Sequence, residues 1–291
     1  MKVYVHPNLD KVNCKAYVTT ACEILNSHGV LLFADEALRD ELGHIIGLQF
    51  GEPVELVKAC DVILVAGGDG TILKCARKTA VFNKPLLGLN SGRLGFMATL
   101  EHTELELLND FCDGKYTLDS RMMISAVVSL ENGAVKKYVA LNDIVLSKGD
   151  GCKIADFEVS KNATVVSALR ADGLIFSTPT GATAYSLSAG GPIIEPVLDC
   201  IEFTQICPHS LFARSMIFSP DSELSVKYNA INNANVILTV DGECKMSLSQ
   251  NDKVLITRSE QRIQLIDIKG SNFHDSINRK LMRPLKDTPE Y

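Results

Sequence analysis

The chain has 291 residues, with 35 acidic and 29 basic side chains and a net charge of −6. This length supplies one large or two ordinary domains with ample core, and the acidic balance argues against nucleic acid or an acidic membrane surface as the main partner. No apolar stretch approaches the ~20 residues that cross a bilayer, and the first residues enter a strand-like run instead of a targeting segment.

Nine cysteines are scattered along the chain, and none of them forms a C-x-x-C pair. An odd and unpatterned set predicts neither a disulfide framework nor a zinc site. We therefore expect a soluble protein of the reducing cytoplasm.

The first hundred residues alternate between strand-like and helix-like segments. Apolar runs typical of strands occupy 3–6, 30–33, 62–66 and 86–89, and helical spacing occurs at 15–26, 38–42 and 72–79. This alternation predicts a parallel sheet with helices on its faces, that is, an N-terminal doubly wound, Rossmann-like α/β domain. Ligands of such sheets bind beyond the carboxyl ends of the strands.

After about residue 111 the pattern changes to short runs of period two, separated by Gly, Asn, Asp and Ser. The runs lie at 125–130, 138–146, 157–159, 174–177, 222–228, 235–240, 253–257 and 262–268. They predict a C-terminal, mostly antiparallel β-sandwich, interrupted by one helix at 180–189 and followed by a terminal helix at 272–283. We expect domains at 1–110 and 111–269, packed closely around a shared cleft.

The segment Gly67-Gly68-Asp69-Gly70-Thr71 follows the predicted strand 61–66 directly. Glycines at the end of a strand permit a sharp turn and a close approach of a ligand to the backbone, and the amides before a helix attract anions. The dinucleotide fingerprint and the P-loop both fail here, because Gly68–Leu73 ends in leucine and no G-x-x-x-x-G-K-S/T occurs. An acidic side chain among such amides indicates that the carboxylate either binds a metal ion or removes a proton from a substrate. The alternative is a simple turn with Asp69 as a helix cap.

Further segments place polar residues where a sheet protein prefers apolar ones. They are Asn90–Phe96, Asn142-Asp143, Arg170–Gly173, Ser177–Ser188 and Cys207–Arg214. With the glycine-rich turn, and in this order, they resemble the motif series of the NAD kinases of bacterial type, from about Val62 to Asp241. The longest matching piece runs from Asp172 to Gly191.

The resemblance implies transfer of the terminal phosphoryl group of ATP to the 2′-hydroxyl of the adenosine ribose of NAD, giving NADP. It also implies a divalent metal cation, for which we expect Mg²⁺, a two-domain subunit, and a homodimer or homotetramer. Members of this family return their last segment to the first domain, so we assign residues 270–291 there. The metal ligands stay unassigned.

In the first half, Asp69 matches the family's catalytic aspartate. A carboxylate beside phosphate-binding amides can take the proton of a ribose hydroxyl or hold Mg²⁺, and we favour the general base. The amides of Gly68 and Gly70 would reach a pyrophosphate without a Cβ in the way. Lys74 matches a basic contact of the family, and the alternative is a solvated helix lysine.

In the second half, Asn142 and Asp143 match an Asn-Glu pair that contacts adenosine, although Asp143 is one methylene shorter; the alternative is a polar strand edge. Lys153 matches a basic residue near the ligand, with a solvated lysine as its alternative. Arg170 and Asp172 match a pair around NAD, with Asp172 near the nicotinamide end. A structural salt bridge is the alternative for that pair.

The match is strongest at Thr183, Ala184, Tyr185 and Ser188. In the predicted helix, Thr183 and Ala184 lie in the first turn, whose N–H groups can meet adenine or ribose, and Tyr185 and Ser188 share a face. A buried core tyrosine is the alternative. The chain departs from the family at Glu243, where relatives often carry glutamine, and at Ser215, where they carry proline. His209 lacks a placed partner, which is typical of a structural histidine.

Two other classes of protein compete with this interpretation. Lipid kinases of the diacylglycerol and sphingosine type, like the phosphofructokinases, share the Gly-Gly-Asp-Gly turn, but Thr178–Gly191 and the Asn142-Asp143 pair favour the NAD kinases. A non-catalytic NAD sensor would have the same cleft. Asp69 argues against a sensor, because a pure binder gains nothing from an acid beside phosphates.

Overall fold

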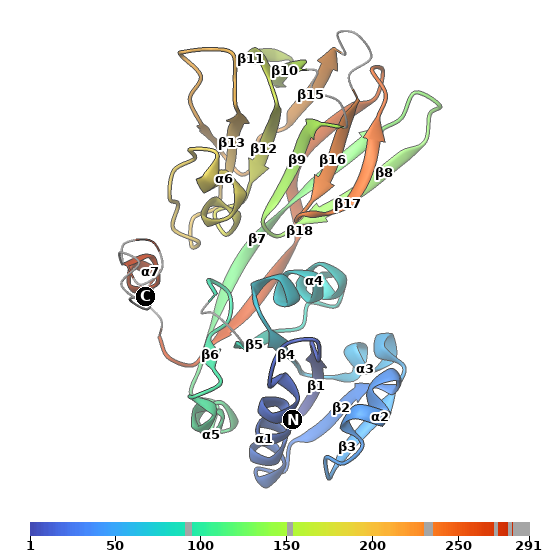
Figure 1. Ribbon diagram of the computed structural model, residues 1–291, viewed down its shortest axis with the longest axis vertical. Coiled ribbons are helices and arrows are strands. Elements are labelled where there is room, and N and C mark those ends of the chain that lie inside the picture. The colour runs from blue at the N-terminus through green and yellow to red at the C-terminus, as the bar shows by residue number, and fades with distance from the viewer. Residues whose placement is uncertain (91–94, 150–153, 230–234, 271–272, 279–280, 282–291) are drawn as a thin grey trace, which may run out of the picture. The chain divides into compact units, whose positions relative to one another are not determined.

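The computed structural model describes residues 1–90, 95–149, 154–229, 235–270, 273–278 and 281, without the side chains of residues 244 and 245. The chain forms two compact units, the first made of residues 1–120 and those from 263 on, and the second of Arg121–Arg262 (Figure 1). The sequence predicts boundaries near 110 and 270 instead. Both boundaries of the structure fall inside long strands, β7 (Thr117–Ser129) and β18 (Lys253–Asp267).

The first unit is built on a parallel sheet with the strand order β3-β2-β1-β4-β5. Its strands are β1 (Lys2–Pro7), β2 (Leu31–Asp35), β3 (Leu48–Gly51), β4 (Val62–Gly67) and β5 (Leu86–Asn90). Every residue of β4 and β5 is buried, as their continuous apolar runs require in a sheet covered on both faces. The strand order reverses between β1 and β4, which is the point where such sheets bind ligands.

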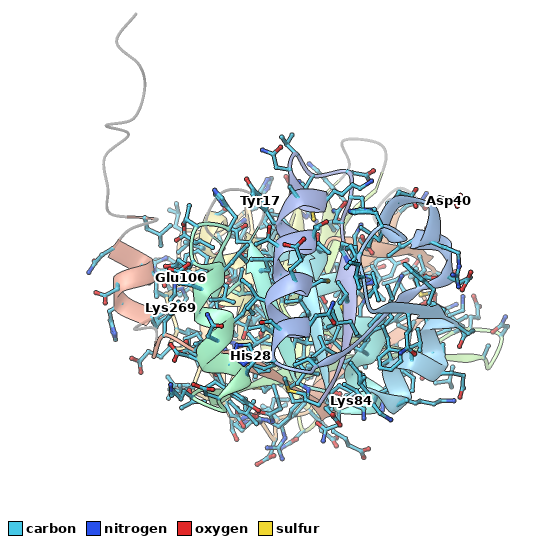
Figure 2. The ribbon with its side chains drawn as sticks, turned by 90° about the horizontal axis from the view of Figure 1, so that it is seen from below. Tyr17, His28, Asp40, Lys84, Glu106 and Lys269 are labelled. Atoms are coloured by element: carbon cyan, nitrogen blue, oxygen red, sulfur yellow. The ribbon has the colours of Figure 1, made fainter. Side chains whose placement is uncertain are left out.

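Helices cover this sheet. They are α1 (Cys14–Ser27), η1 (Glu36–Leu38), α2 (Arg39–Leu42), α3 (Pro53–Ala59), α4 (Asp69–Thr79), η2 (Ala80–Phe82), η3 (Leu105–Leu107) and α5 (Leu108–Cys112). Helix α1 buries Cys14, Val18, Ala21, Cys22 and Leu25, which form a stripe of helical period. Figure 2 shows α1 beside α5, and both helices contribute to one apolar core. The short elements β3 and α3 are not predicted by the sequence pattern.

The end of the chain returns to the first unit. Leu265 of β18 pairs with Leu86 of β5, which also pairs with the short strand β6 (Leu100–Glu101). Lys269 donates to both carboxylate oxygens of Glu104, at 3.0 and 2.7 Å. Within the predicted terminal helix, the structure describes α7 (Phe273–Ile277).

The second unit consists of two sheets whose described pairings are antiparallel, in the orders β11-β10-β15-β18-β7-β8 and β14-β13-β12-β9-β16-β17. Their remaining strands are β8 (Val135–Ala140), β9 (Asp143–Lys148), β10 (Ala155–Lys161), β11 (Thr164–Ala171), β12 (Gly173–Ser177), β13 (Ile201–Ile206), β14 (Met216–Phe218), β15 (Leu224–Asn229), β16 (Val236–Val240) and β17 (Glu243–Leu248).

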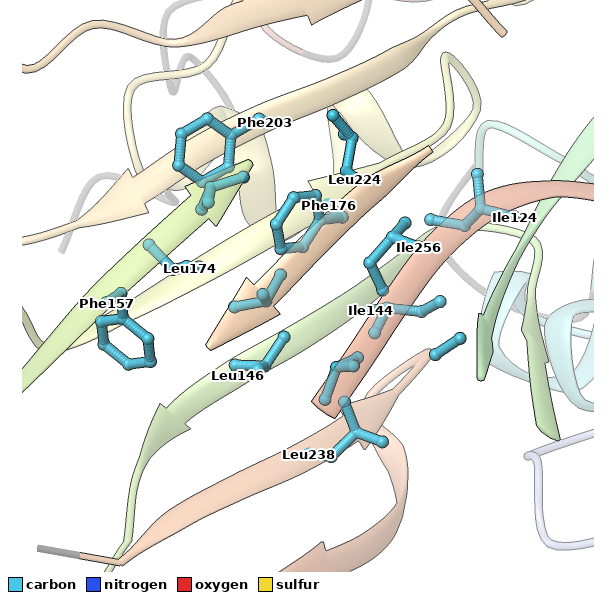
Figure 3. Close-up of a cluster of buried hydrophobic side chains, with 14 of the residues drawn as sticks. Ile124, Ile144, Leu146, Phe157, Leu174, Phe176, Phe203, Leu224, Leu238 and Ile256 are labelled. Atoms are coloured by element: carbon cyan, nitrogen blue, oxygen red, sulfur yellow. The ribbon is translucent and has the colours of Figure 1, made fainter. Parts of the chain in front are cut away.

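The core of the second unit lies between these two sheets. Apolar side chains from both sheets form one buried cluster (Figure 3). Phe176 of β12 and Phe203 of β13 stack within it, with ring centroids 5.2 Å apart. The predicted fold class, a parallel α/β domain followed by an antiparallel β-sandwich, is confirmed.

The predicted strand at 138–146 is wrong, because the segment forms parts of two strands. β8 ends at Ala140 in one sheet and β9 begins at Asp143 in the other. Leu141 and Asn142 carry the chain across, and their backbone groups bond to the side chains or turns of other segments. An apolar pattern continues through the crossing because both sheets face the same core.

The predicted helix at 180–189 is only partly correct. The segment forms two short helical pieces, η4 (Gly181–Thr183) and α6 (Tyr185–Ser188), which are separated by Ala184 at φ −100° and ψ −123°. Gly181 and the hydroxyl residues lower the helix propensity of this segment, and its buried side-chain hydrogen bonds set the local shape. Thr183 and Ala184 therefore do not begin a continuous helix.

Two absences apply to the part of the chain that the structure describes. None of its helices is both long and apolar enough to cross a membrane. Its seven described cysteines carry free thiols, and most of them are buried.

Candidate functional site

The glycine-rich turn lies at the carboxyl end of β4, next to the end of β1. Gly67 closes β4, Gly68 is the N-cap of α4, and the helix begins at Asp69. The backbone N–H of Asn8, just after β1, donates to the carbonyl of Ala66 at 2.8 Å, and its side-chain amide donates to Thr71 Oγ1 at 3.2 Å. The turn therefore occupies the position where the strand order reverses.

The Asp69 carboxylate holds a second segment of the first unit. Its Oδ2 accepts the N–H of Phe96 at 2.6 Å, and its Oδ1 accepts the N–H of Met97 at 3.1 Å. A Cβ at Gly95 would overlap this carboxylate, so glycine is needed there for the carboxylate to keep this position. The two glycine-containing motifs that follow β4 and β5 thus meet at Asp69. Because Gly68 is the N-cap, the helix-cap interpretation of Asp69 is wrong.

The glycines of the turn differ in their surroundings. A Cβ at Gly67 would collide with the side chain of Thr71, whereas a Cβ at Gly68 or Gly70 would meet no heavy atom within 4 Å. Lys74 lies exposed one turn further along α4. Open space beside Gly68 and Gly70, at the N-terminus of an eleven-residue helix, suits an anionic ligand.

In the second unit, Asn142 lies at the crossing from β8 to β9. Its carbonyl accepts the N–H of Thr178 at 2.9 Å and the hydroxyl of Ser177 at 3.2 Å. Its side-chain Oδ1 is buried and has no hydrogen-bond partner among the described residues. A buried acceptor without a donor is costly, which is typical of a group that a ligand satisfies. The polar strand edge alternative is wrong for Asn142, which is outside the strands, whereas Asp143 does begin a strand.

Asp143 is the first residue of β9 and is 5% exposed. Burial, and then the neighbouring carboxylate of Asp241, raise the pKa of Asp143 to about 7. Both effects disfavour the charged form of a carboxyl group. Asp143 is therefore a neutral acid below about pH 7.

Arg170 and Asp172 each have an ion-pair partner, but they do not pair with each other. Arg170 donates to both carboxylate oxygens of Asp156, at 2.7 and 3.1 Å, across the β10–β11 pair. Asp172 lies 2.7 Å from the Lys148 ammonium group, and both side chains are about one-third exposed. Each charge therefore takes part in a structural salt bridge on the surface of the second unit, as the alternative expects, but with a different partner.

The segment around Thr178 is fixed to the Asn142 crossing. The Thr178 hydroxyl donates to the carbonyl of Leu141 at 2.5 Å and accepts the N–H of Gly181 at 3.1 Å. A Cβ at Gly181 would overlap the carbonyl of Asn142. The structure thus brings Asn142 and Asp143 together with the start of the 177–188 segment.

The side chains of α6 point in two directions. Tyr185 is 46% exposed and Ser188 is also exposed, whereas Ser186 between them is fully buried. The buried-tyrosine interpretation is therefore wrong, and Tyr185 offers a flat surface with a polar tip. Thr183 and Ala184, just before α6, are partly buried.

A buried polar network under α6 is missed by the sequence patterns. Ser186 Oγ donates to Glu202 Oε1 at 2.6 Å, and the Thr204 hydroxyl donates to the same oxygen at 3.0 Å. Glu202 is fully buried, and burial raises its pKa. A Cβ at Gly191 would overlap Glu202 and Ser186. The one sequence signal is an acid, Glu202, inside an apolar strand.

Lys153 and residues 91–94 of the Asn90–Phe96 motif lie outside the described residues. Within the described ranges, no group of three or more His, Cys, Asp or Glu side chains could hold a metal ion. Mg²⁺ commonly takes one or two carboxylates together with substrate phosphates and water. The single Asp69 carboxylate beside an anion site fits an ion of that kind.

The comparisons with known proteins all identify the same family. The ATP-NAD kinase N-terminal domain matches residues 53–116, and the ATP-NAD kinase C-terminal domain matches residues 141–268. The chain is 36% identical to the NAD kinase of Caldanaerobacter subterraneus over 96% of this chain and 98% of that protein. It is 40% identical to the NAD kinase of Symbiobacterium thermophilum over 76% of this chain and 78% of that protein.

Two solved structures share the fold. Yeast NADH kinase complexed with NADH has a TM-score of 0.88 at 23% identity, over 100% of this chain and 89% of that one. An NAD kinase from Archaeoglobus fulgidus in complex with ATP has a TM-score of 0.72 at 22% identity, over 95% and 97%. Because the bacterial relatives match across nearly the whole chain, this chain belongs to the NAD kinase family of enzymes.

Proposed function

We propose that the chain transfers the terminal phosphoryl group of ATP to the 2′-hydroxyl of the adenosine ribose of NAD, with Asp69 as the general base. The observation that carries the proposal is the Asp69 carboxylate, fixed by the N–H groups of Phe96 and Met97 at the reversal point of the sheet. Open space surrounds the Cβ positions of the neighbouring Gly68 and Gly70.

The contacts of Asp69 suit proton removal. Each carboxylate oxygen accepts one backbone N–H and keeps further acceptor capacity for a hydroxyl group. In the proposed step, the carboxylate takes the 2′-hydroxyl proton while the 2′-oxygen forms a bond to the γ-phosphorus of ATP. The bond from that phosphorus to the β,γ-bridging oxygen breaks, and ADP leaves. Phosphoryl transfer depends mainly on the positioning of the reacting groups, so a base that is already held in place suits the reaction.

The remaining groups of the first unit would stabilise negative charge. The amides of Gly68 and Gly70, at the start of α4, are proposed to bind phosphate oxygens, because a helix N-terminus favours anions. The exposed Lys74 adds a positive charge one turn along α4. A divalent cation, proposed to be Mg²⁺, would neutralise charge on the phosphates when bound with ATP.

The residues of the second unit are proposed to bind NAD. Asn142 supplies a buried acceptor that lacks a donor among the described residues, and Asp143 supplies an acid that is neutral below about pH 7. Tyr185 supplies an exposed aromatic surface. The further binding residues, proposed from the family resemblance, are Lys153, Arg170, Asp172, Thr183, Ala184 and Ser188.

Two properties stay predictions. The prediction of a homodimer or homotetramer is based on the family resemblance, and the prediction of a cytoplasmic location is based on the cysteine pattern. The NADH named in the yeast structure and the ATP named in the archaeal one support a dinucleotide and ATP as the substrates here.

The direct test mixes the purified chain with Mg²⁺, ATP and NAD and measures NADP by an enzymatic cycling assay. Parallel reactions replace ATP by polyphosphate and NAD by NADH. We expect NADP with ATP and NAD, and none without the chain. If no donor gives NADP while NAD still binds, the kinase proposal fails and the NAD sensor replaces it.

A further inference from the structure

Asp241 lies in the two-residue turn between β16 and β17. Val240 pairs with Glu243 across this turn, and Asp241 and Gly242 have φ values of 48° and 69°. Positive φ at both central residues defines a type I′ turn, in which Asp followed by Gly is favoured. The turn explains the residue types, but it does not require the Asp241 side chain to bond to anything else.

The Asp241 carboxylate nevertheless accepts three successive backbone N–H groups of the second unit. Oδ2 accepts from Leu141 at 3.0 Å, and Oδ1 accepts from Asn142 at 2.8 Å and from Asp143 at 3.1 Å. Asp241 is only 8% exposed, and its own N–H donates to the carbonyl of Asp143 at 2.9 Å. Hydrogen bonds to a charged acceptor are stronger than those between neutral groups, so one side chain fixes the whole crossing from β8 to β9.

Asn142 is held from the opposite side as well. Its carbonyl accepts the N–H of Thr178 and the hydroxyl of Ser177, and Gly181 packs directly on that carbonyl. With both backbone groups of Asn142 bonded, the starting point of its side chain is set. The buried Oδ1 at the end of that side chain has no donor among the described residues.

We propose that Asp241 is a positioning residue for dinucleotide binding: its three hydrogen bonds hold Asn142 so that Oδ1 accepts a hydrogen bond from an amino group of the ligand. The inference rests on the proposed function, because it takes NAD as the ligand of Asn142. Asp241 itself does not contact the substrate. It acts only through the backbone that carries Asn142.

The test compares variants that keep the turn. Asp241→Asn and Asp241→Gly both tolerate positive φ, but the first replaces one acceptor oxygen by a donor and the second removes the carboxylate. Gly242→Ala is the matched control, because it strains the same turn at φ 69° without touching the carboxylate, and its Cβ meets open space. Each variant is assayed for kcat, for KM with NAD and with ATP, and for stability in urea.

We expect Asp241→Asn to raise KM for NAD about tenfold, the effect of one lost charge-assisted hydrogen bond, and to leave KM for ATP within about twofold. Asp241→Gly should raise KM for NAD further. Gly242→Ala should lose stability with KM for NAD unchanged. An equal rise of KM for NAD in Gly242→Ala, or no rise in Asp241→Asn, would overturn the proposal and leave Asp241 as a turn residue.

A double-mutant cycle tests whether Asp241 acts through Asn142. In an Asn142→Ala background, Asp241→Asn should have no further effect on KM for NAD, because the side chain that it positions is gone. Additive effects would contradict the proposal. If the unaltered chain binds NAD but forms no NADP, the proposed function fails. The role of Asp241 can then still be decided, by comparing Kd for NAD between each variant and the unaltered chain in place of KM. Absence of NAD binding would overturn both proposals.

Discussion

Asp69 combines a chemical role with a structural one, and substitution should separate them. In Asp69→Asn the side-chain amide can accept only one of the two N–H groups of Phe96 and Met97, and it cannot take a proton from a hydroxyl. We expect turnover to fall by ~10²–10⁴, the usual effect of losing a general base, with Kd for NAD near normal. Steady-state kinetics and titration calorimetry measure the two. Equal losses of binding and turnover would indicate a purely structural residue.

Gly95→Ala keeps the Asp69 carboxylate but displaces it. The added Cβ would overlap the carboxylate, so the side chain must leave the N–H groups of Phe96 and Met97. We expect kcat to fall at least tenfold while NAD still binds, because the base is no longer held in place. Gly51→Ala in β3, whose Cβ would make only ordinary contacts with Leu56, is the steric comparison. Full kcat in Gly95→Ala would show that the position of Asp69 is unimportant.

Asp143 should make stability depend on pH. Its folded pKa of about 7 is above the ordinary value of 3.8, so the fold favours the protonated form. The stabilising effect is complete below about pH 4, and it is lost as pH rises through about 7, with a slope of up to about 1.4 kcal/mol per pH unit. Asp143→Asn should flatten the curve of unfolding free energy against pH in this window, measured by urea denaturation.

Asp156→Asn is the control for that experiment. The pKa of Asp156 is lowered, chiefly by its hydrogen bond with Arg170, so its effect has the opposite sign. The Asp156→Asn variant should keep the fall in stability between about pH 4 and 7 that Asp143 produces. An unchanged curve in Asp143→Asn would mean that this carboxyl titrates normally.

At the scale of elements, α6 carries one serine with a structural role and another that is proposed to bind NAD. Ser186 is buried and donates to Glu202, whereas Ser188 is exposed two residues later. Ser186→Ala should lower the unfolding free energy by about 1–3 kcal/mol, because the buried Glu202 carboxyl loses one of the two hydroxyl donors to its Oε1. Ser188→Ala should change stability by less than about 0.5 kcal/mol and raise KM for NAD severalfold. If Ser188→Ala leaves KM for NAD unchanged, Ser188 is not a binding residue.

The elements that the sequence predicts well are those with one clear pattern. Strands β4 and β5 are continuous apolar runs in the sequence, and the buried residues of α1 recur with helical period. The pattern fails where apolar character continues through a change of partner, as between β8 and β9, and where side-chain hydrogen bonds replace propensity, as around α6. A sequence pattern records burial, but it does not record which sheet an element joins.

At the scale of the whole molecule, the motif residues can be predicted from the sequence, but the contacts that hold them in place cannot. Asp69 and Asn142 stand within recognisable motifs. Gly95 and Asp241 support them from 26 and 99 positions away along the chain. Gly95 belongs to the Asn90–Phe96 motif and Asp241 to an Asp-Gly turn, but neither residue type indicates which side chain or backbone it will contact, because these contacts form only in the folded unit.

Metal removal should stop turnover without unfolding the chain. Within the described residues no cluster of side chains could hold a structural ion, so the cation is expected to arrive with the phosphates of ATP. EDTA should abolish NADP formation, addition of Mg²⁺ should restore it, and the thermal midpoint should stay unchanged. A large drop of the midpoint in EDTA would contradict this prediction by revealing a structural metal.

The most direct test of the account is a crystal structure of the chain with NAD bound. The quantity to measure is the distance from the Asp69 carboxylate oxygens to the 2′-oxygen of the adenosine ribose. We predict a hydrogen bond of about 2.6–3.2 Å, directly or through one water. A carboxylate that points away from the ribose, more than about 6 Å from the 2′-oxygen and without a bridging water or cation, would contradict the role of Asp69 as the base.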